Sequence, residues 1–194
     1  MIFRETGLDG AWLIEPERIR DGRGYFARTW CVDEFHEHGI GANFLQCGTS
    51  YNERRGTLRG IHLQAAPCEE AKLVRCTRGR LYDVMVDLRP DSTTFGRWKA
   101  FELSADNGRL VYLPEGFGHG FQTMEDATEI AYQISEIYRP SAALGIRWDD
   151  PDLAVSWPTP DAAILSDRDR ALPSFERFRA TAAAAAPAPR RASA

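Results

Sequence analysis

The sequence is short of cysteine and lacks long apolar runs, and each shortage argues against a class of protein. Its four cysteines, Cys31, Cys47, Cys68 and Cys76, include no Cys-x-x-Cys pair, so we expect reduced thiols and a cytoplasmic protein. No stretch approaches the roughly 18 apolar residues that span a bilayer, and the N-terminus shows no apolar region of a signal peptide. We therefore expect a soluble protein without a membrane span.

Positive charge is also scarce relative to negative charge. Lys and Arg number 24 against 28 Asp and Glu, which gives a formal net charge of −4. This balance argues against a general binder of nucleic acid or of membrane surfaces. An anionic ligand would instead need a local cluster of arginines.

Helical patterns are rare, and only residues 33–38, closed by Gly39, predict a helix in the first half. Short apolar runs separated by turn signals predict strands at 12–15, 24–30, 44–50, 57–64, 72–77, 81–88, 98–103, 110–113, 120–124 and 128–136. The first two are expected to pair as a hairpin. This spacing indicates one all-β sandwich or barrel over residues 1–178, and the Ala-, Pro- and Arg-rich residues 179–194 are predicted to be a disordered tail.

The strand at 57–64 carries polar side chains that core packing alone does not explain. Strict alternation would place Arg59 and His62 on opposite faces. Gly60 lies between them, and a glycine inside a strand often marks a bulge that redirects side chains beside an active site. We therefore expect an irregular strand that brings both side chains to one pocket. The alternative is a surface arginine with a hydrogen-bonded core histidine.

A second strand, at 81–88, places Asp83 and Asp87 on one face. That face lies either in solvent, which is the commoner case, or against a ligand. Lys72, on the preceding strand, could approach Asp83 across the Arg78-Gly79 turn.

The glycine-rich segment 113–122 presents His119 between two aromatic residues. It is expected to place the imidazole at the rim of a cavity, and the alternative is a histidine that caps a turn. Tyr132 has apolar neighbours on its own face of the strand 128–136. This pattern favours a core residue but does not exclude a catalytic one.

Five segments carry a resemblance that none of them would carry alone. They are Gly-Thr-Leu-Arg-Gly-Ile-His-Leu-Gln (56–64), Lys-Leu-Val-Arg (72–75), Tyr-Asp-Val-Met-Val-Asp-Leu-Arg (82–89), Leu-Pro-Glu-Gly-Phe-Gly-His-Gly-Phe (113–121) and Gly-Ile-Arg-Trp-Asp-Asp-Pro (145–151). In order and spacing they resemble the dTDP-4-dehydrorhamnose 3,5-epimerases, over about residues 20–173. The resemblance implies a cupin-type double-stranded β-helix, or jelly roll, and a homodimer with an exchanged N-terminal segment.

The resemblance also implies an activity that needs no metal and no cofactor. It is epimerisation at C3, C5 or both of a nucleotide-diphosphate-linked 4-keto-6-deoxyhexose. The expected reaction converts dTDP-4-dehydro-6-deoxy-D-glucose into dTDP-4-dehydro-L-rhamnose. Because the C4 ketone acidifies the protons on C3 and C5, the reaction needs a base, an acid on the other face of the sugar and stabilisation of the enolate.

The family's catalytic roles can be placed on residues of this sequence. By resemblance, His62 is the base and Asp169 orients its imidazole. Tyr132 is the proton donor, and Lys72 lies near the enolate oxygen, where a positive charge stabilises the transition state. Asp83 is expected to support catalysis by holding Lys72 in position.

The residues that by resemblance bind the substrate are Arg23, Gln46, Arg59, His119, Tyr138 and Arg168. Guanidinium groups suit a diphosphate because they donate paired hydrogen bonds, and Tyr138 would stack on the base. Four residues depart from the family's usual choice: Arg28 and Ala143 stand where Glu is usual, Gly48 where Asn is usual, and Leu63 where Tyr is common. The alternative is therefore inversion at only C3 or C5, or a CDP- or GDP-linked sugar.

Two other classes of protein are weighed against the epimerase. A metal-dependent cupin enzyme is the second alternative, because residues 114–119 resemble a cupin metal motif. However, Gln64 stands where an H-x-H pair would place a second histidine, which leaves His62 and His119 as candidate ligands. A non-catalytic sugar-nucleotide-binding protein would keep the arginines without needing the three residues His62, Asp169 and Tyr132 together.

Overall fold

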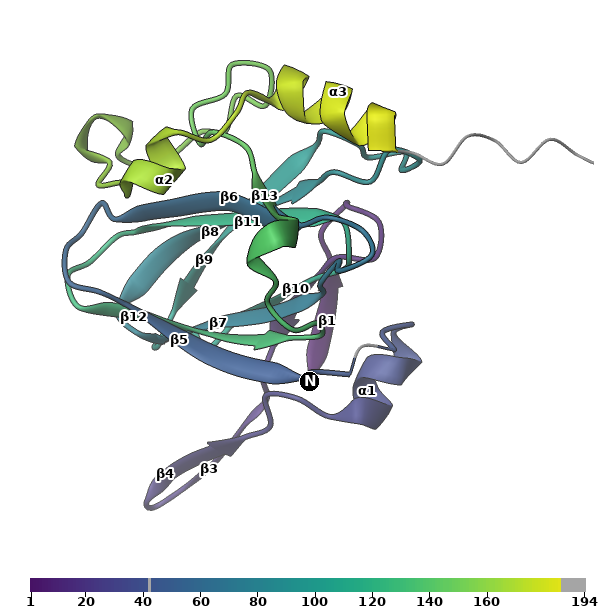
Figure 1. The fold of residues 1–194 in the computed structure, drawn as a ribbon. Helices are drawn as coiled ribbons and strands as arrows, with labels where there is room; N and C mark the ends of the chain where they lie inside the picture. The colour runs from purple at the N-terminus through teal and green to yellow at the C-terminus, as the bar shows by residue number, and fades with distance from the viewer. Residues whose placement is uncertain (42, 186–194) are drawn as a thin grey trace, which may run out of the picture.

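The computed structural model describes residues 1–41 and 43–185, which form two facing β-sheets (Figure 1). A six-stranded sheet has the order β1-β2-β10-β7-β12-β5. Its strands are β1 (Ile2–Glu5), β2 (Trp12–Glu15), β5 (Gln46–Asn52), β7 (Lys72–Arg78), β10 (Leu110–Leu113) and β12 (Thr128–Ile134). A five-stranded sheet has the order β13-β6-β11-β8-β9. Its strands are β6 (Leu58–Gln64), β8 (Arg80–Asp87), β9 (Trp98–Ser104), β11 (Phe117–Thr123) and β13 (Ala143–Gly145).

Successive strands pass back and forth between the two sheets. From β5 to β8, consecutive strands alternate between the two sheets, and the strand pairs within each sheet are antiparallel. This topology confirms the predicted all-β jelly roll. Each of the eight strands expected between residues 44 and 136 is present, with ends that differ by a few residues.

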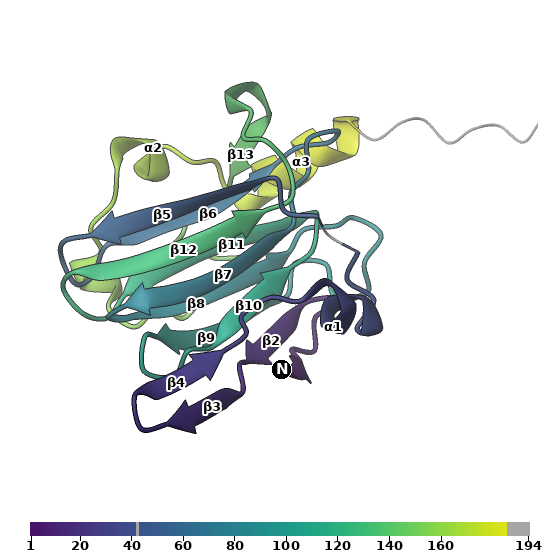
Figure 2. The same cartoon turned by 90° about the horizontal axis from the view of Figure 1, so that it is seen from below.

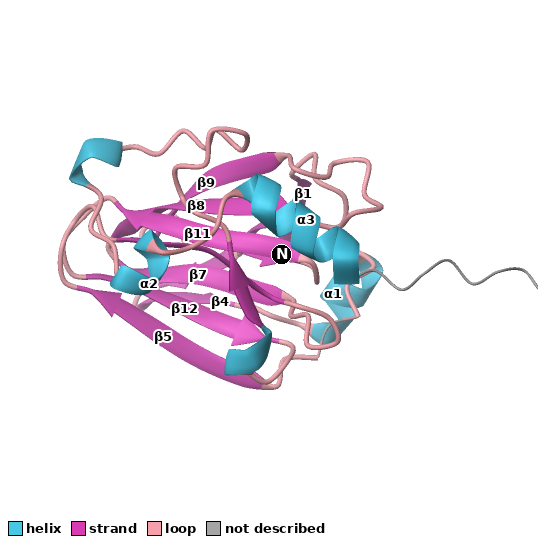
Figure 3. Cartoon of the chain, turned by 45° about the horizontal axis from the view of Figure 1, so that its top comes forward, coloured by secondary structure: helices cyan, strands magenta, loops and turns pink. Residues whose placement is uncertain are grey.

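Helices lie outside the sandwich (Figure 3) and are α1 (Val32–Glu37), α2 (Asp167–Arg170) and α3 (Phe175–Ala185). The α1 bounds agree with the expected helix to within one residue. Residues 179–185 belong to α3, so the predicted disordered tail is wrong over this stretch. The remaining tail residues, 186–194, lie outside the described residues. No helix within the described ranges is long and apolar enough to cross a membrane.

Three apolar clusters hold these layers together. The first lies between the sheets and includes Val74 and Met85, one from each sheet. The second packs Phe175 and Phe178 of α3 on the outer face of the five-stranded sheet. In the third, Phe35 of α1 covers part of the outer face of the six-stranded sheet. Elsewhere on that face, Cys47 and Thr49 of β5 are exposed.

The two remaining strands, β3 (Arg18–Asp21) and β4 (Gly24–Ala27), form a separate hairpin that projects from the body (Figure 2). The expected pairing of 12–15 with 24–30 is wrong, because β2 pairs with β1 and β10. The hairpin exposes 69 % of Ile19 and 64 % of Phe26. These two residues are directly paired across the hairpin, so their side chains form an exposed apolar patch.

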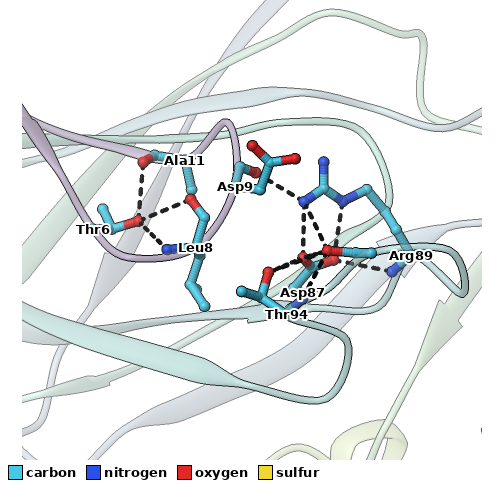
Figure 4. Close-up of polar contacts among 8 residues, drawn as sticks. Thr6, Leu8, Asp9, Ala11, Asp87, Arg89 and Thr94 are labelled. Carbon is cyan, nitrogen blue, oxygen red and sulfur yellow. Dashed lines mark hydrogen bonds and ion pairs between the residues drawn. The ribbon is translucent and has the colours of Figure 1, made fainter.

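Asp87 is fully buried, so of the two alternatives for its face of β8 the solvent-exposed one is excluded. Its carboxylate accepts hydrogen bonds from Arg89, Ser92 and Thr94 (Figure 4). The Arg89 guanidinium also donates to the carbonyl of Asp9, in the loop after β1. Burial opposes the charge of Asp87, but these hydrogen bonds outweigh it and lower the pKa of the carboxyl. The network joins the end of β8 to the N-terminal segment.

Candidate active site

The strand β6 is irregular at Gly60, as the sequence predicts. Arg59 and His62 are three residues apart, yet they pair with residues of β11 that are two apart. Gly60 has a φ of +122°, and a Cβ at this position would lie 2.4 Å from the Cα of Gly120. Only glycine fits such a backbone approach. The extra residue turns Arg59 and His62 to the same side of the strand.

That side is the interior of the sandwich. Arg59 donates from Nε to Oδ1 of Asn52 at 2.9 Å, and Asn52 lies on β5 of the opposite sheet. This hydrogen bond joins the inner faces of the two sheets. The expected irregularity at Gly60, which turns Arg59 and His62 to one side of β6, is therefore confirmed.

His62 and Asp169 form the expected histidine–carboxylate pair. His62 Nε2 lies 2.5 Å from Asp169 Oδ1, and the imidazole keeps about a third of its surface exposed. Ser166, the N-cap of α2, donates from Oγ to the second carboxylate oxygen at 2.8 Å and accepts from the backbone N–H of Asp169. Burial disfavours the Asp169 anion, but the bonds from His62 and Ser166 outweigh it and lower the pKa of the carboxyl.

Tyr132 faces the interior from β12, on the sheet opposite His62. Its ring packs edge-on against His119, with 5.9 Å between the ring centroids. Burial raises the pKa of the Tyr132 phenol, and the charge of Asp83 raises it further while Arg59 opposes the rise. The phenol is therefore protonated at neutral pH, which is the form that a proton donor needs.

Lys72 does not contact Asp83, so the expected support of the lysine by this aspartate is wrong. Lys72 Nζ lies 2.9 Å from Oε1 of Glu70, and both side chains are buried. Gln64 donates to the other oxygen of Glu70 at 2.9 Å, and Lys72 also donates to the carbonyl of His62 at 3.4 Å. A buried carboxylate fixes the ammonium beside the backbone of the candidate base.

Asp83 instead pairs with His119. The distance from Asp83 Oδ2 to His119 Nε2 is 2.9 Å, and both residues are at least 95 % buried. The expected place of His119 at a rim is therefore wrong, because it lies on the buried strand β11, next to β8. Lys72 and Asp83 lie on β7 and β8, which belong to opposite sheets, and each bonds another partner, Glu70 and His119 respectively. The other Asp83 oxygen is buried without a hydrogen-bond partner among the described residues.

Three of the residues expected to bind the nucleotide meet at one end of the sandwich. Gln46 Oε1 accepts from the backbone N–H of Tyr138 at 3.3 Å, and the Tyr138 hydroxyl accepts from Arg168 at 3.3 Å. The Tyr138 side chain is half exposed. Arg59, on β6, is also exposed and bonds Asn52 of the opposite sheet.

Arg23 is the expected binding residue that the chain does not bring to the site. It lies in the turn of the β3–β4 hairpin, its side chain is 91 % exposed, and it bonds only to Asp21 within the described residues. The hairpin projects away from the sandwich (Figure 1). A contribution from Arg23 to the site would need a second chain.

The residues that depart from the family's usual choice occupy different surroundings. Arg28 is exposed and pairs with Glu34 at 3.1 Å. Ala143 is half-buried opposite Gln64, and Gly48 lies in the middle of β5. Within the described ranges, no group of three or more His, Cys, Asp or Glu side chains is arranged to hold a metal ion.

Two contributors to the site were not expected from the sequence. Ser166 could have been found, because Ser-x-x-Asp at 166–169 is a helix-capping pattern that positions the carboxylate. Glu70 gave only a weak signal, an acidic residue two positions before Lys72 on a segment without strand periodicity.

Comparisons with known proteins agree with this geometry. A family model described as dTDP-4-dehydrorhamnose 3,5-epimerase matches residues 5–177. A curated protein of that name from Methanothermobacter thermautotrophicus is 44 % identical over 170 residues, covering 87 % of this chain and 91 % of the relative. A dTDP-4-dehydrorhamnose 3-epimerase from Streptomyces niveus is 41 % identical over 88 % of this chain and 82 % of the relative.

A solved structure shows the same fold. The dTDP-4-dehydrorhamnose 3,5-epimerase from Bacillus anthracis, crystallised with TDP and PPi bound, superposes with a TM-score of 0.87. It is 40 % identical in sequence, and the match covers 90 % of this chain and 99 % of that chain.

Proposed function

This chain belongs to the dTDP-4-dehydrorhamnose 3,5-epimerase family, and from that premise we propose that it inverts C3 and C5 of a dTDP-linked 4-keto-6-deoxyhexose. The proposed substrate is dTDP-4-dehydro-6-deoxy-D-glucose and the product is dTDP-4-dehydro-L-rhamnose. One observation carries the proposal: a carboxylate-bound histidine and a half-buried tyrosine face the same interior from opposite sheets. Inversion by deprotonation and reprotonation needs a base and an acid on opposite faces of one carbon.

His62 is the proposed base. Because Nε2 bonds Asp169, Nδ1 is the nitrogen that would take the proton from C3 or C5. The electron pair left on carbon moves to the C4 oxygen and forms an enolate. The adjacent carboxylate stabilises the imidazolium that results, as in other histidine–carboxylate pairs.

Tyr132 is the proposed acid and Lys72 the proposed stabiliser of the enolate. The phenol delivers its proton to the face opposite His62, which inverts the carbon. The Lys72 ammonium, held by Glu70, is a fixed positive charge available where negative charge develops on the C4 oxygen. We propose that Asp83 acts through His119, which it holds in place beside Tyr132.

The remaining contacts would hold the nucleotide. We propose that Arg59, Arg168 and His119 contact the diphosphate and the sugar next to it, and that Tyr138 stacks on the base with Gln46 beside it. The contacts among Gln46, Tyr138 and Arg168 support this division, because they gather an aromatic ring, an amide and a guanidinium at one end of the sandwich.

We also propose a homodimer, to which the β3–β4 hairpin contributes. The hairpin exposes Ile19 and Phe26, and the outer face of the six-stranded sheet holds a pocket of about 450 Å³ beside Arg75. A second copy could cover both surfaces and receive Arg23 at its site. Phe26→Asp is expected to yield monomers in analytical ultracentrifugation; a variant that sediments like the wild-type dimer would contradict this arrangement.

The proposed location is the cytoplasm. All four cysteines are free thiols in the structure, and Cys76 is buried, which supports a reducing compartment.

The decisive experiment is proton exchange in deuterated water. The protein is incubated with dTDP-4-dehydro-6-deoxy-D-glucose, and C3 and C5 are followed by NMR. Deuterium at both carbons is expected, and His62→Ala should lose exchange while still binding dTDP. His36→Ala, which changes an exposed histidine of α1, is the matched control. Absence of label with dTDP-, CDP- and GDP-linked 4-keto sugars would refute the epimerase function and favour a binding protein.

A single-site C3 epimerase is the second candidate. The observation that favours it is the 41 % identity to a relative named as a 3-epimerase, which is close to the identity with the double epimerases. The same experiment separates the two candidates, because a C3 epimerase places deuterium at C3 alone.

A further inference from the structure

Gln64, the last residue of β6, is a buried glutamine to which the proposed mechanism gives no role. It is 2 % exposed, and it lies two residues after the proposed base, on the same face of the strand. Burying an amide is costly unless its donor and acceptor groups are paired. The partners of this amide therefore indicate what Gln64 contributes.

The first set of partners belongs to the segment that carries Tyr138. Gln64 Oε1 accepts from the backbone N–H of Arg139 at 2.6 Å, and Nε2 donates to the carbonyl of Ile137 at 3.4 Å. These two peptide groups lie on either side of Tyr138, whose own N–H donates to Gln46. The backbone beneath the proposed stacking ring is thus held by side chains at three successive residues.

The second set of partners leads to the proposed catalytic lysine. Gln64 Nε2 donates to Oε2 of Glu70 at 2.9 Å, and Glu70 Oε1 lies 2.9 Å from Lys72 Nζ. Nε2 also donates to the carbonyl of Cys68 at 3.1 Å, in the loop that leads to Glu70. Because a backbone N–H only donates and a carboxylate only accepts, turning the amide over would break the contacts with both sets. The direction of the amide is therefore fixed.

The contact between Gln64 and Glu70 controls how the lysine is aimed. An ammonium has three N–H bonds, and within the described residues Lys72 directs one to Glu70 and one to the carbonyl of His62. The third is available to the C4 oxygen of the substrate. Without Gln64, both oxygens of the buried carboxylate would turn to the ammonium and shift it. Misplacing a group in an active site by about 1 Å can cost on the order of 100-fold in rate.

We propose that Gln64 is a positioning residue that joins the nucleotide-contact segment 137–139 to the Lys72 ammonium. This inference rests on the proposed function. The amide oxygen holds the backbone that carries the stacking tyrosine, and the amide nitrogen holds the carboxylate that aims the lysine. One buried side chain therefore sets where the base and the sugar lie relative to each other.

The test is Gln64→Met, which keeps the length of the side chain and removes its hydrogen bonds. The kcat for deuterium incorporation should fall about tenfold or more, because the lysine is misplaced. The Kd for dTDP, measured by calorimetry, should rise roughly threefold to tenfold, which corresponds to about one hydrogen bond. Gln64→Asn, whose arm is one methylene shorter, should show both losses at smaller size and replaces the methionine variant if that variant does not fold.

A double-mutant cycle separates positioning from a general loss of stability. The second background is Glu70→Leu with Lys72→Met, which removes the buried pair, and its residual turnover is followed over long incubation. In this background Gln64→Met should change kcat by no more than about twofold and still raise the Kd for dTDP by the same factor as before. A residue that only stabilises the fold would lower kcat equally in both backgrounds.

Gln122→Met is the matched control. Gln122 is also buried in the five-stranded sheet, and its amide both donates to and accepts from the backbone of Thr159, outside the candidate site. This variant should lower Tm but leave kcat and the Kd for dTDP within about twofold. If the Gln64 variants turn over like wild type, or lose the same factor in both backgrounds, the inference is wrong. If wild type incorporates no deuterium, the proposed function fails and the inference fails with it.

Discussion

Removing Glu70 should destabilise the protein strongly, because it leaves the Lys72 ammonium buried without its carboxylate. The two groups lie 2.9 Å apart, with 9 % of the lysine side chain and 8 % of the glutamate side chain exposed. Breaking a buried ion pair by removing one partner typically costs about 3–5 kcal/mol, because the remaining charge is uncompensated. For a chain of this size that corresponds to a fall in Tm of roughly 6–20 °C.

The assay is thermal and urea unfolding of Glu70→Ala beside Glu69→Ala. Glu69 is exposed, so its loss should change the free energy of unfolding by no more than about 0.5 kcal/mol. The double variant Glu70→Leu with Lys72→Met removes both charges and should recover most of the lost stability, since replacing a buried pair by apolar groups is often neutral. This reasoning would be refuted if Glu70→Ala and Glu69→Ala had the same free energy of unfolding, or if the double variant were less stable than Glu70→Ala.

Three further predictions concern individual residues. The pKa of Asp87 is lowered in the folded protein, so the ionised carboxylate stabilises the fold fully above its unfolded pKa of about 3.9, and this stabilisation is lost as pH falls through the lower folded pKa. The free energy of unfolding in urea should therefore depend less on pH below about 4 for Asp87→Asn than for the wild type. The same pH dependence for both proteins would contradict this. Because burial raises the pKa of Tyr132, an ultraviolet difference titration of wild type against Tyr132→Phe should show no phenolate from this residue below a pH of about 10. Ionisation of Tyr132 at a lower pH would contradict the raised pKa. Gly60→Ala should lower Tm far more than Gly48→Ala, because of the two only the Cβ at Gly60 meets backbone, at 2.4 Å; similar midpoints would show that the bulge is not constrained.

The irregularity of β6 was predictable because it is written in local sequence. A glycine between Arg59 and His62 can take a backbone conformation closed to other residues, and the structure shows that it does. The strand periodicity was equally local, since alternation follows from the pleat. These features needed no knowledge of what each strand packs against.

Resemblance supplied what periodicity could not. The pattern around Tyr132 favoured a core residue, and only the match to a known family pointed to an acid. The structure places Tyr132 both at the edge of the apolar cluster and beside His119, so the ambiguity of the pattern reflects a residue that has both environments. Neither source indicated Glu70, whose contact with Lys72 depends on how the chain enters β7.

The sequence by itself determined the strands, the bulge at Gly60 and the set of polar residues available for chemistry, because each depends on neighbours along the chain. Only the tertiary structure decided which of those polar residues pair. Asp83 bonds His119 because the turn after β7 sends β8 into the opposite sheet, beside β11, whereas Lys72 bonds Glu70 on the segment that leads into β7. A short turn is compatible with a hairpin in one sheet and with a crossing between two, and the choice follows from which apolar faces can be buried together.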